Sequence, residues 1–142
     1  MYNSPSFSIL YVEDEQAARE ILCSILIRKY PKITLYVAEN GDKGLEAFKE
    51  HLPEIVITDI SMPQMDGIQL ATEIKSLQPK TSVIATTAHS SVQSLDNSKK
   101  IGINHYIQKP IIYKELFAAI DKCASVLTPP PLILINQVPY PS

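Results

Sequence analysis

The chain has 142 residues, of which 45% are hydrophobic and 20% are charged, and its formal net charge is -2 at pH 7. This length and composition are those of one ordinary domain with a buried core. The mixed charge indicates no basic surface for nucleic acid or an anionic membrane, and no apolar stretch approaches the roughly 18 residues of a membrane span. The N-terminus also lacks the basic and apolar regions of a signal peptide. We therefore expect a cytoplasmic protein without direct nucleic-acid or membrane contacts.

Short apolar runs recur along the chain and are typical of buried strands. We predict strands over residues 7–12, 33–37, 55–59, 82–86 and 105–108. Between the strands, apolar residues follow the three-to-four spacing of amphipathic helices. The apolar faces are formed by Ala18, Ile21, Leu22, Ile25 and Leu26 in the first helix, by Ala71, Ile74 and Leu77 before Pro79, and by Leu116, Phe117, Ile120 and Ala124 in the last.

Strands and helices alternate, and the connections between strands are too long for hairpins. Such repeated units imply right-handed crossovers and therefore a parallel sheet with helices on both faces. The sequence thus predicts a doubly wound α/β fold. Cys23 and Cys123 both fall within predicted helices, where we expect them to be reduced core residues.

The segment 90–101 is the least apolar of the predicted helices, since serine and asparagine dilute its apolar spacing. Poor helix propensity and few apolar contacts lower local stability, which is required of an element that moves when a ligand or a modification arrives. A merely exposed surface helix is the alternative, and the sequence favours neither.

The helical pattern ends at Ala124, so that a domain of residues 1–124 is followed by a proline-rich tail of residues 125–142. The prolines at 129–131 predict a stiff extended spacer, and the apolar run 132–135 follows it. This run has three interpretations: an added edge strand, a partner-binding tail or the stump of a longer chain. Because an exposed apolar segment promotes aggregation, we expect it to pack on its own domain or on a second copy in a homodimer. The tail encodes no visible output domain.

Acidic residues end two of the predicted strands. Glu13 and Asp14 follow the run 7–12, and Asp59 is the last residue of the run 55–59. The carboxyl ends of parallel strands meet at one rim of a sheet, where α/β proteins bind ligands. Repulsion among these carboxylates would raise at least one pKa unless a cation neutralised them, and oxygen-only ligands favour Mg²⁺. The histidines of the chain have no spacing typical of a zinc site.

Two further side chains are expected at the same rim, because Thr87 follows the fourth predicted strand and Lys109 the fifth. Phosphoryl transfer depends on positioning and on neutralising the charge of the phosphoryl oxygens. A carboxylate nucleophile beside Mg²⁺, an ammonium group and a hydroxyl meets that requirement. We therefore predict that Asp59 is phosphorylated, with Thr87 and Lys109 beside the phosphoryl group.

Four segments, in order, resemble the receiver domains of bacterial two-component response regulators. They are 9–15 (ILYVEDE), 58–67 (TDISMPQMDG), 86–89 (TTAH) and 106–110 (YIQKP). The resemblance covers about residues 7–124. It implies a flavodoxin-like (βα)5 fold with strand order 2-1-3-4-5, as in chemotaxis receivers.

The resemblance also implies how the acidic rim would hold Mg²⁺. Asp14 would bind the ion directly, Glu13 would hold a water molecule on it, and Asp59 would bind it as well. The main-chain carbonyl of Ser61 would be a further ligand. Glu13 stands where the commonest family pattern has aspartate, which is a frequent variant.

In the family pattern Thr87 and Lys109 would each contact a phosphoryl oxygen, and the peptide bond from Lys109 to Pro110 would be cis. Tyr106 resembles the family's switch aromatic: Thr87 would move toward the phosphate and the ring of Tyr106 would enter the vacated space. An ordinary half-buried strand tyrosine is the alternative. His89 stands where the family tunes the lifetime of the phosphate, or else it faces solvent.

The implied function is a signalling switch, not an enzyme, since the chain would assist only its own phosphorylation and autodephosphorylation. A histidine kinase or a phosphotransfer protein would phosphorylate Asp59, and the changed surface around the fourth helix and fifth strand would bind a downstream protein. One alternative is a docking or dimerisation scaffold that is not phosphorylated. The other is an aspartyl-phosphate phosphohydrolase, which is disfavoured because such enzymes carry a second acid where this chain has Ser61.

Overall fold

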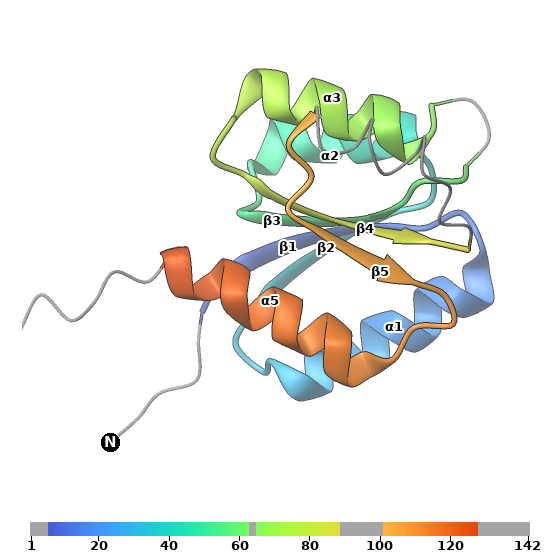
Figure 1. Ribbon diagram of the computed structural model, residues 1–142, viewed down its shortest axis with the longest axis vertical. Coiled ribbons are helices and arrows are strands. Elements are labelled where there is room, and N and C mark those ends of the chain that lie inside the picture. The colour runs from blue at the N-terminus through green and yellow to red at the C-terminus, as the bar shows by residue number, and fades with distance from the viewer. Residues whose placement is uncertain (1–5, 63–64, 89–100, 128–142) are drawn as a thin grey trace, which may run out of the picture.

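The structure is a computed structural model that describes residues 6–62, 65–88 and 101–127. The strands are β1 (Ser8–Val12), β2 (Thr34–Ala38), β3 (Ile55–Asp59), β4 (Ser82–Thr87) and β5 (His105–Gln108), and the helices are α1 (Gln16–Lys29), α2 (Gly41–His51), α3 (Gly67–Leu77) and α5 (Tyr113–Leu127). Strands and helices alternate from β1 to β4, and residues 89–100, between β4 and β5, lie outside the described part (Figure 1). Each strand begins and ends within one residue of its predicted bounds.

The five strands form one parallel sheet in the order β2-β1-β3-β4-β5. This confirms the doubly wound α/β fold and the strand order 2-1-3-4-5. Because β1 pairs on both of its edges, Val12 lies opposite Ala38 of β2 and opposite Thr58 of β3. The carboxyl ends of β1 and β3 are therefore level with each other.

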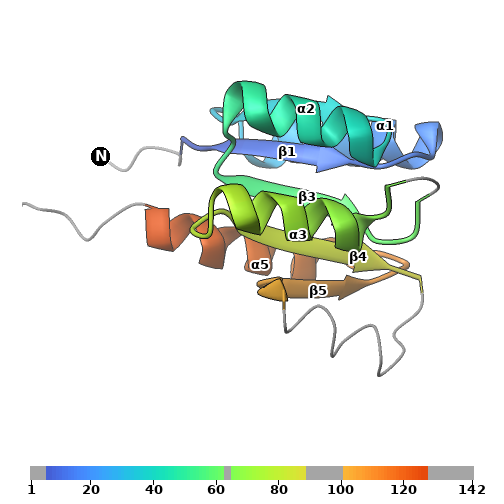
Figure 2. The same ribbon diagram turned by 90° about the horizontal axis from the view of Figure 1, so that it is seen from above.

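Helices cover both faces of the sheet. Figures 1 and 2 show α1 and α5 on one face and α2 and α3 on the other. Successive residues of a strand point to opposite faces, so β1, β2, β3 and β4 each supply both hydrophobic cores, whereas β5 supplies Ile107 to one of them. The core beneath α1 and α5 includes Ile9, Leu26, Ile57, Ile84 and Ile120, and the core beneath α2 and α3 includes Leu10, Phe48, Val56, Ile74 and Val83. The central strand β3 is buried along its whole length.

Helix α1 buries a narrower apolar stripe than the sequence predicts. Only Leu22 and Leu26, one turn apart, are fully buried, whereas Ile21 is 55% exposed. The expectation for Ile21 was therefore wrong, because only a narrow strip of α1 faces the sheet. Leu77, in the last turn of α3, is also 47% exposed rather than buried.

Polar side chains fix the starts of α2 and α3. The side chain of Asn40 accepts a hydrogen bond from the amide of Lys43 at 2.8 Å, and Asp66 accepts one from the amide of Gln69 at 2.9 Å. These caps satisfy amides that have no partner within the helix. The cap at Asp66 sets the position of α3 directly after the loop that follows Asp59.

A lysine ties together the opposite, amino edge of the sheet. Lys75 Nζ donates hydrogen bonds to the carbonyl oxygen of Thr81 at 2.6 Å and to Asn104 Oδ1 at 3.0 Å. Asn104 Oδ1 also accepts from the amide of Val83 at 2.8 Å, so one ammonium group joins α3, the start of β4 and the approach to β5. Partial burial lowers the pKa of Lys75.

Several expectations fall on parts of the chain that the structure does not describe. These include nearly all of the weak helix at 90–101, His89, and residues 128–142 of the predicted tail. Helix α5 ends at Leu127, so residues 125–127, which we expected to begin the tail, are helical. Cys23 and Cys123 are both free, and Cys123 is buried. None of the helices described is long and apolar enough to cross a bilayer.

Candidate functional site

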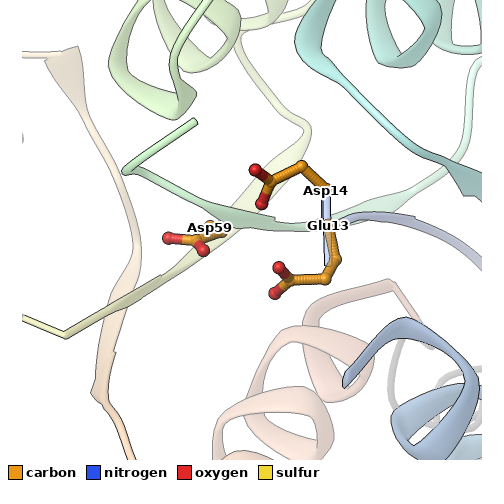
Figure 3. A group of neighbouring side chains, drawn as sticks. All are labelled: Glu13, Asp14 and Asp59. Carbon is orange, nitrogen blue, oxygen red and sulfur yellow. The ribbon is translucent and has the colours of Figure 1, made fainter. Parts of the chain in front are cut away.

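Three carboxylates converge at the carboxyl edge of the sheet. Glu13 and Asp14 directly follow β1, and Asp59 ends the adjacent strand β3. Oxygen atoms of the three carboxylates lie within 4.8 Å of one another. Figure 3 shows the side chains of Glu13 and Asp14 on either side of the end of β1, with both carboxyl groups turned toward the side on which Asp59 lies. The predicted acidic rim is therefore a compact group of side chains.

Glu13 is held through both its main chain and its side chain. Its amide donates to the carbonyl of Ala38 at 3.1 Å, its carbonyl accepts from Arg19 Nη1 at 2.9 Å, and its Oε2 accepts from the amide of Glu15 at 3.1 Å. The residue is only 2% exposed. Burial raises the pKa of Glu13, because the bond from Glu15 and the charge of Lys109 compensate only in part.

Lys109 brings a positive charge to the carboxylates. Its Nζ donates to Asp59 Oδ2 at 2.8 Å and lies 3.3 Å from Glu13 Oε1. The amide of Lys109 donates to the carbonyl of Thr87 at 2.7 Å, and the peptide bond to Pro110 is cis, as the resemblance implied. Partial burial would lower the pKa of Lys109, but the hydrogen bond and the charge of Asp59 outweigh it and raise the pKa.

Asp59 is buried, and the chain that follows it packs closely around it. Its carboxylate accepts a hydrogen bond from the amide of Ser61 at 3.0 Å as well as the bond from Lys109. Gly67, at the start of α3, lies so near that an added Cβ would be 2.3 Å from the carbonyl oxygen of Asp59. Glycine is required at this position by close approach of the two backbones.

Thr87 and Tyr106 lie on neighbouring strands and on one face of the sheet. Thr87 ends β4 and is 1% exposed, whereas Tyr106 is half-buried in β5 and pairs with Ala85. Alternation along the strands places Thr87, Ala85 and Tyr106 on the same side as Val83, the side of α2 and α3. The preceding residue, Thr86, points to the other side, and its Oγ1 is buried without a hydrogen-bond partner among the described residues.

The donor set at this edge suits a hard divalent cation such as Mg²⁺. Its side-chain donors are carboxylate oxygens, and Asp14 is exposed while Glu13 and Asp59 are buried. Oxygen ligands with net negative charge fit Mg²⁺, whereas zinc sites use histidine and cysteine, and neither belongs to this group. The arrangement can hold a cation beside a carboxylate nucleophile.

A cavity of about 240 Å³ opens beside the carboxylates on the side of α1 and α5. Glu13 and Lys109 are charged residues of its lining, and Tyr11 and Leu22 belong to its apolar part. Ile21 and Tyr113, which are 55% and 38% exposed, lie at its walls. The site is therefore continuous with an exposed apolar surface.

Two residues that contribute to the site were not identified from the sequence. Gly67 is the last residue of the segment 58–67. A glycine directly after the helix cap Asp66 is a sequence signal that two backbones approach each other closely. Arg19 lies six residues beyond Glu13 and carries no local signal, since an arginine on an amphipathic helix is ordinarily a solvated side chain.

Comparisons with known proteins agree with this geometry. The model of the response regulator receiver domain matches residues 9–121. The chemotaxis protein CheY of Bacillus subtilis is 32% identical over 114 residues, which are 80% of this chain and 94% of that protein. The probable C4-dicarboxylate response regulator DctR of Priestia megaterium is 28% identical over 87% of this chain, and the match spans only 54% of its own length.

Solved structures give the same result for the fold. The response regulator receiver domain protein from Clostridium thermocellum superimposes with a TM-score of 0.79 at 27% identity. The superposition covers 85% of this chain and 96% of that one.

Proposed function

Because this chain belongs to the family of response regulator receiver domains, we propose that it is a signalling switch that is turned on by phosphorylation of Asp59. The observation that carries the proposal is the contact of one ammonium group, Lys109 Nζ, with both Asp59 and Glu13 inside a cluster of carboxylates. A buried carboxylate with a fixed cation and a cation-binding donor set is what phosphoryl transfer to aspartate requires.

In the proposed reaction a carboxylate oxygen of Asp59 attacks phosphorus as the bond to the donor's leaving group breaks. Lys109 would transfer its contact to a phosphoryl oxygen, and the Thr87 hydroxyl would donate to another. Mg²⁺, held by Asp14, Asp59 and the Ser61 carbonyl and by Glu13 through a water molecule, would neutralise charge on the phosphoryl oxygens. The product is an aspartyl phosphate, which water later hydrolyses; the chain turns over no separate substrate.

The output of the switch would be a change of surface. Thr87 and Tyr106 lie on one face of β4 and β5, so a shift of Thr87 toward the phosphate would alter the space available to the Tyr106 ring. The surface around β5 and the segment before it would then bind a downstream protein target. We assign the chain to the cytoplasm on the basis of its family.

The phosphoryl donor would be a histidine kinase or a phosphotransfer protein. A donor must bring its phosphohistidine to Asp59, and the apolar surface at Ile21 and Tyr113 adjoins the cavity that reaches Lys109. Exposed apolar groups beside a functional pocket are typical of a protein-binding site. We place the docking of the donor there.

Phosphorylation by a small-molecule donor tests the assignment of Asp59. The purified chain is incubated with acetyl phosphate, with and without Mg²⁺, and its intact mass is compared with that of Asp59→Asn. We expect a gain of one phosphoryl group that requires Mg²⁺ and is absent from Asp59→Asn. Retained labelling of Asp59→Asn would refute the site, and no labelling despite Mg²⁺ binding would favour the docking scaffold if a protein donor also failed.

The docking surface has a matched control on the same helix. Ile21 and Ile27 are 55% and 56% exposed on α1, but only Ile21 lines the cavity. Using a phosphotransfer protein that labels the wild type, we expect Ile21→Asp to slow transfer about tenfold and Ile27→Asp to leave it unchanged. Labelling by acetyl phosphate should be the same in all three proteins. Equal transfer rates from the protein donor would place docking elsewhere.

A further inference from the structure

The peptide group between Glu13 and Asp14 is held from the side of α1. Arg19 Nη1 donates to the carbonyl oxygen of Glu13 at 2.9 Å, and the amide of Arg19 donates to the carbonyl of Glu15 at 2.9 Å as the first hydrogen bond of α1. One arginine thereby joins the end of β1 to the start of the helix.

The hydrogen bond from Arg19 to the Glu13 carbonyl affects the position of the Asp14 side chain more than that of the Glu13 side chain. The Glu13 carboxylate has its own partners in Lys109 and the amide of Glu15, and its main-chain amide is bonded to Ala38. Asp14 is exposed, so packing does not restrict its side chain. The direction in which Asp14 leaves the end of β1 depends on the peptide plane whose oxygen Arg19 holds.

We propose that Arg19 is a positioning residue for the cation, in that its hydrogen bond to the Glu13 carbonyl aims Asp14 into the carboxylate cluster. The inference rests on the proposed function only in taking Mg²⁺ as the cation. Removing a group that orients a metal ligand without touching the metal commonly weakens metal binding about 10-fold to 100-fold.

The charge of Arg19 predicts the opposite result. The guanidinium bonded to the Glu13 carbonyl adds positive charge beside an acidic residue, and positive charge competes with a divalent cation, so removing it should strengthen Mg²⁺ binding if electrostatics alone mattered. A role confined to anchoring α1 predicts a third result, namely lower stability with unchanged Mg²⁺ affinity of the folded protein. The sign of the change in affinity therefore separates the three explanations.

The test compares Arg19→Met, Arg19→Lys and Arg28→Ala with the wild type in the full chain. Methionine keeps the aliphatic packing but removes both donor and charge, and lysine keeps a charged donor. Arg28 is the only other arginine of the sequence and lies exposed in the last turn of the same helix. Mg²⁺ affinity is measured by titration calorimetry without any phosphoryl donor, and thermal unfolding confirms that each variant is folded.

We expect Arg19→Met to bind Mg²⁺ about tenfold more weakly, Arg19→Lys to regain most of the loss, and Arg28→Ala to match the wild type. Amide resonances of Asp14 and Glu15 should shift in Mg²⁺-free Arg19→Met. Unchanged or tighter Mg²⁺ binding by Arg19→Met would overturn the proposal. If Arg19→Met fails to fold, Arg19→Gln takes its place. Wild-type Mg²⁺ affinity in Arg19→Gln, with unshifted amide resonances of Asp14 and Glu15, would then overturn the proposal. Failure of the wild type to accept phosphate bears on the proposed function alone, because this test measures binding.

Discussion

Two half-buried lysines lie at opposite edges of the sheet and have different partners. Lys109 contacts the carboxylates of Asp59 and Glu13 at the carboxyl edge, and its pKa is raised. Lys75 contacts neutral oxygen atoms of Thr81 and Asn104 at the amino edge, and its pKa is lowered. Two lysines with similar burial therefore have pKa values shifted in opposite directions and different roles.

The partners explain the difference. Lys75 completes the hydrogen bonding of main-chain and amide oxygens, and its hydrogen-bond acceptors within the described part of the chain are all neutral. Among the described residues, Lys109 is the one cation paired with the three acidic side chains, so negative charge remains at its edge. A buried cluster of charges that the protein does not neutralise itself indicates a binding site. A lysine that is bonded to neutral oxygen atoms indicates a structural role. Substitutions of each lysine can test this contrast.

Removing Lys109 should have the largest effect. In Mg²⁺-free buffer we expect Lys109→Met to lower the free energy of unfolding by about 3 kcal/mol, because two buried carboxylates lose their positive partner. Added Mg²⁺ should restore much of the loss and should bind more tightly than to the wild type, since the competing ammonium is gone. Urea unfolding with and without Mg²⁺ measures both effects. A loss that Mg²⁺ leaves unchanged would contradict the assignment of this edge to a cation.

Removing Lys75 should have a smaller effect that does not depend on Mg²⁺. Lys75→Met keeps the aliphatic stem but leaves the oxygens of Thr81 and Asn104 without the ammonium donor, so we expect a loss of about 1 to 2 kcal/mol. The same urea titrations apply. Rescue of this variant by Mg²⁺ would break the contrast between the two edges.

Substitution of Thr86 should change the free energy of unfolding least, and in the opposite direction to the two lysine substitutions. Its hydroxyl is buried at the carboxyl edge without a partner among the described residues, and valine has nearly the same shape. We expect Thr86→Val to raise the free energy of unfolding by about 0.5 to 1 kcal/mol and to leave phosphorylation by acetyl phosphate unchanged.

The neighbouring Thr87→Val should slow phosphorylation. Equal phosphorylation rates in the two variants would argue against a role for the Thr87 hydroxyl.

The fold was predictable because its strands are short, apolar and buried on both faces. Runs such as 55–59 stand out by composition alone, and the lengths of the connections require a parallel sheet. The strand order came from the resemblance, since pairing between distant strands leaves no local trace in the sequence. Ile21 shows the limit of helical periodicity, because the spacing of apolar residues does not reveal how wide a strip the sheet covers.

The acidic site was predictable for a topological reason: residues that end parallel strands must meet at one edge. Glu13, Asp14, Asp59 and Lys109 all follow this rule. Arg19 does not, because its contact with the Glu13 carbonyl depends on the path of the chain between β1 and α1 and on the rotamer of a long side chain. Contacts of side chains with main-chain oxygens remain invisible to patterns of residue type.

The order of the strands in the sheet also determines how the protein can assemble during synthesis. Strand β1 emerges first, β2 joins one of its edges, and β3, β4 and β5 then add in turn to the other side. Each new strand thus finds its partner already present, although the parallel pairing of these strands makes every pairing non-local and slow. Glu13 and Asp14 leave the ribosome early and Lys109 late, so a nascent chain acquires its complete pocket only when β5 is added.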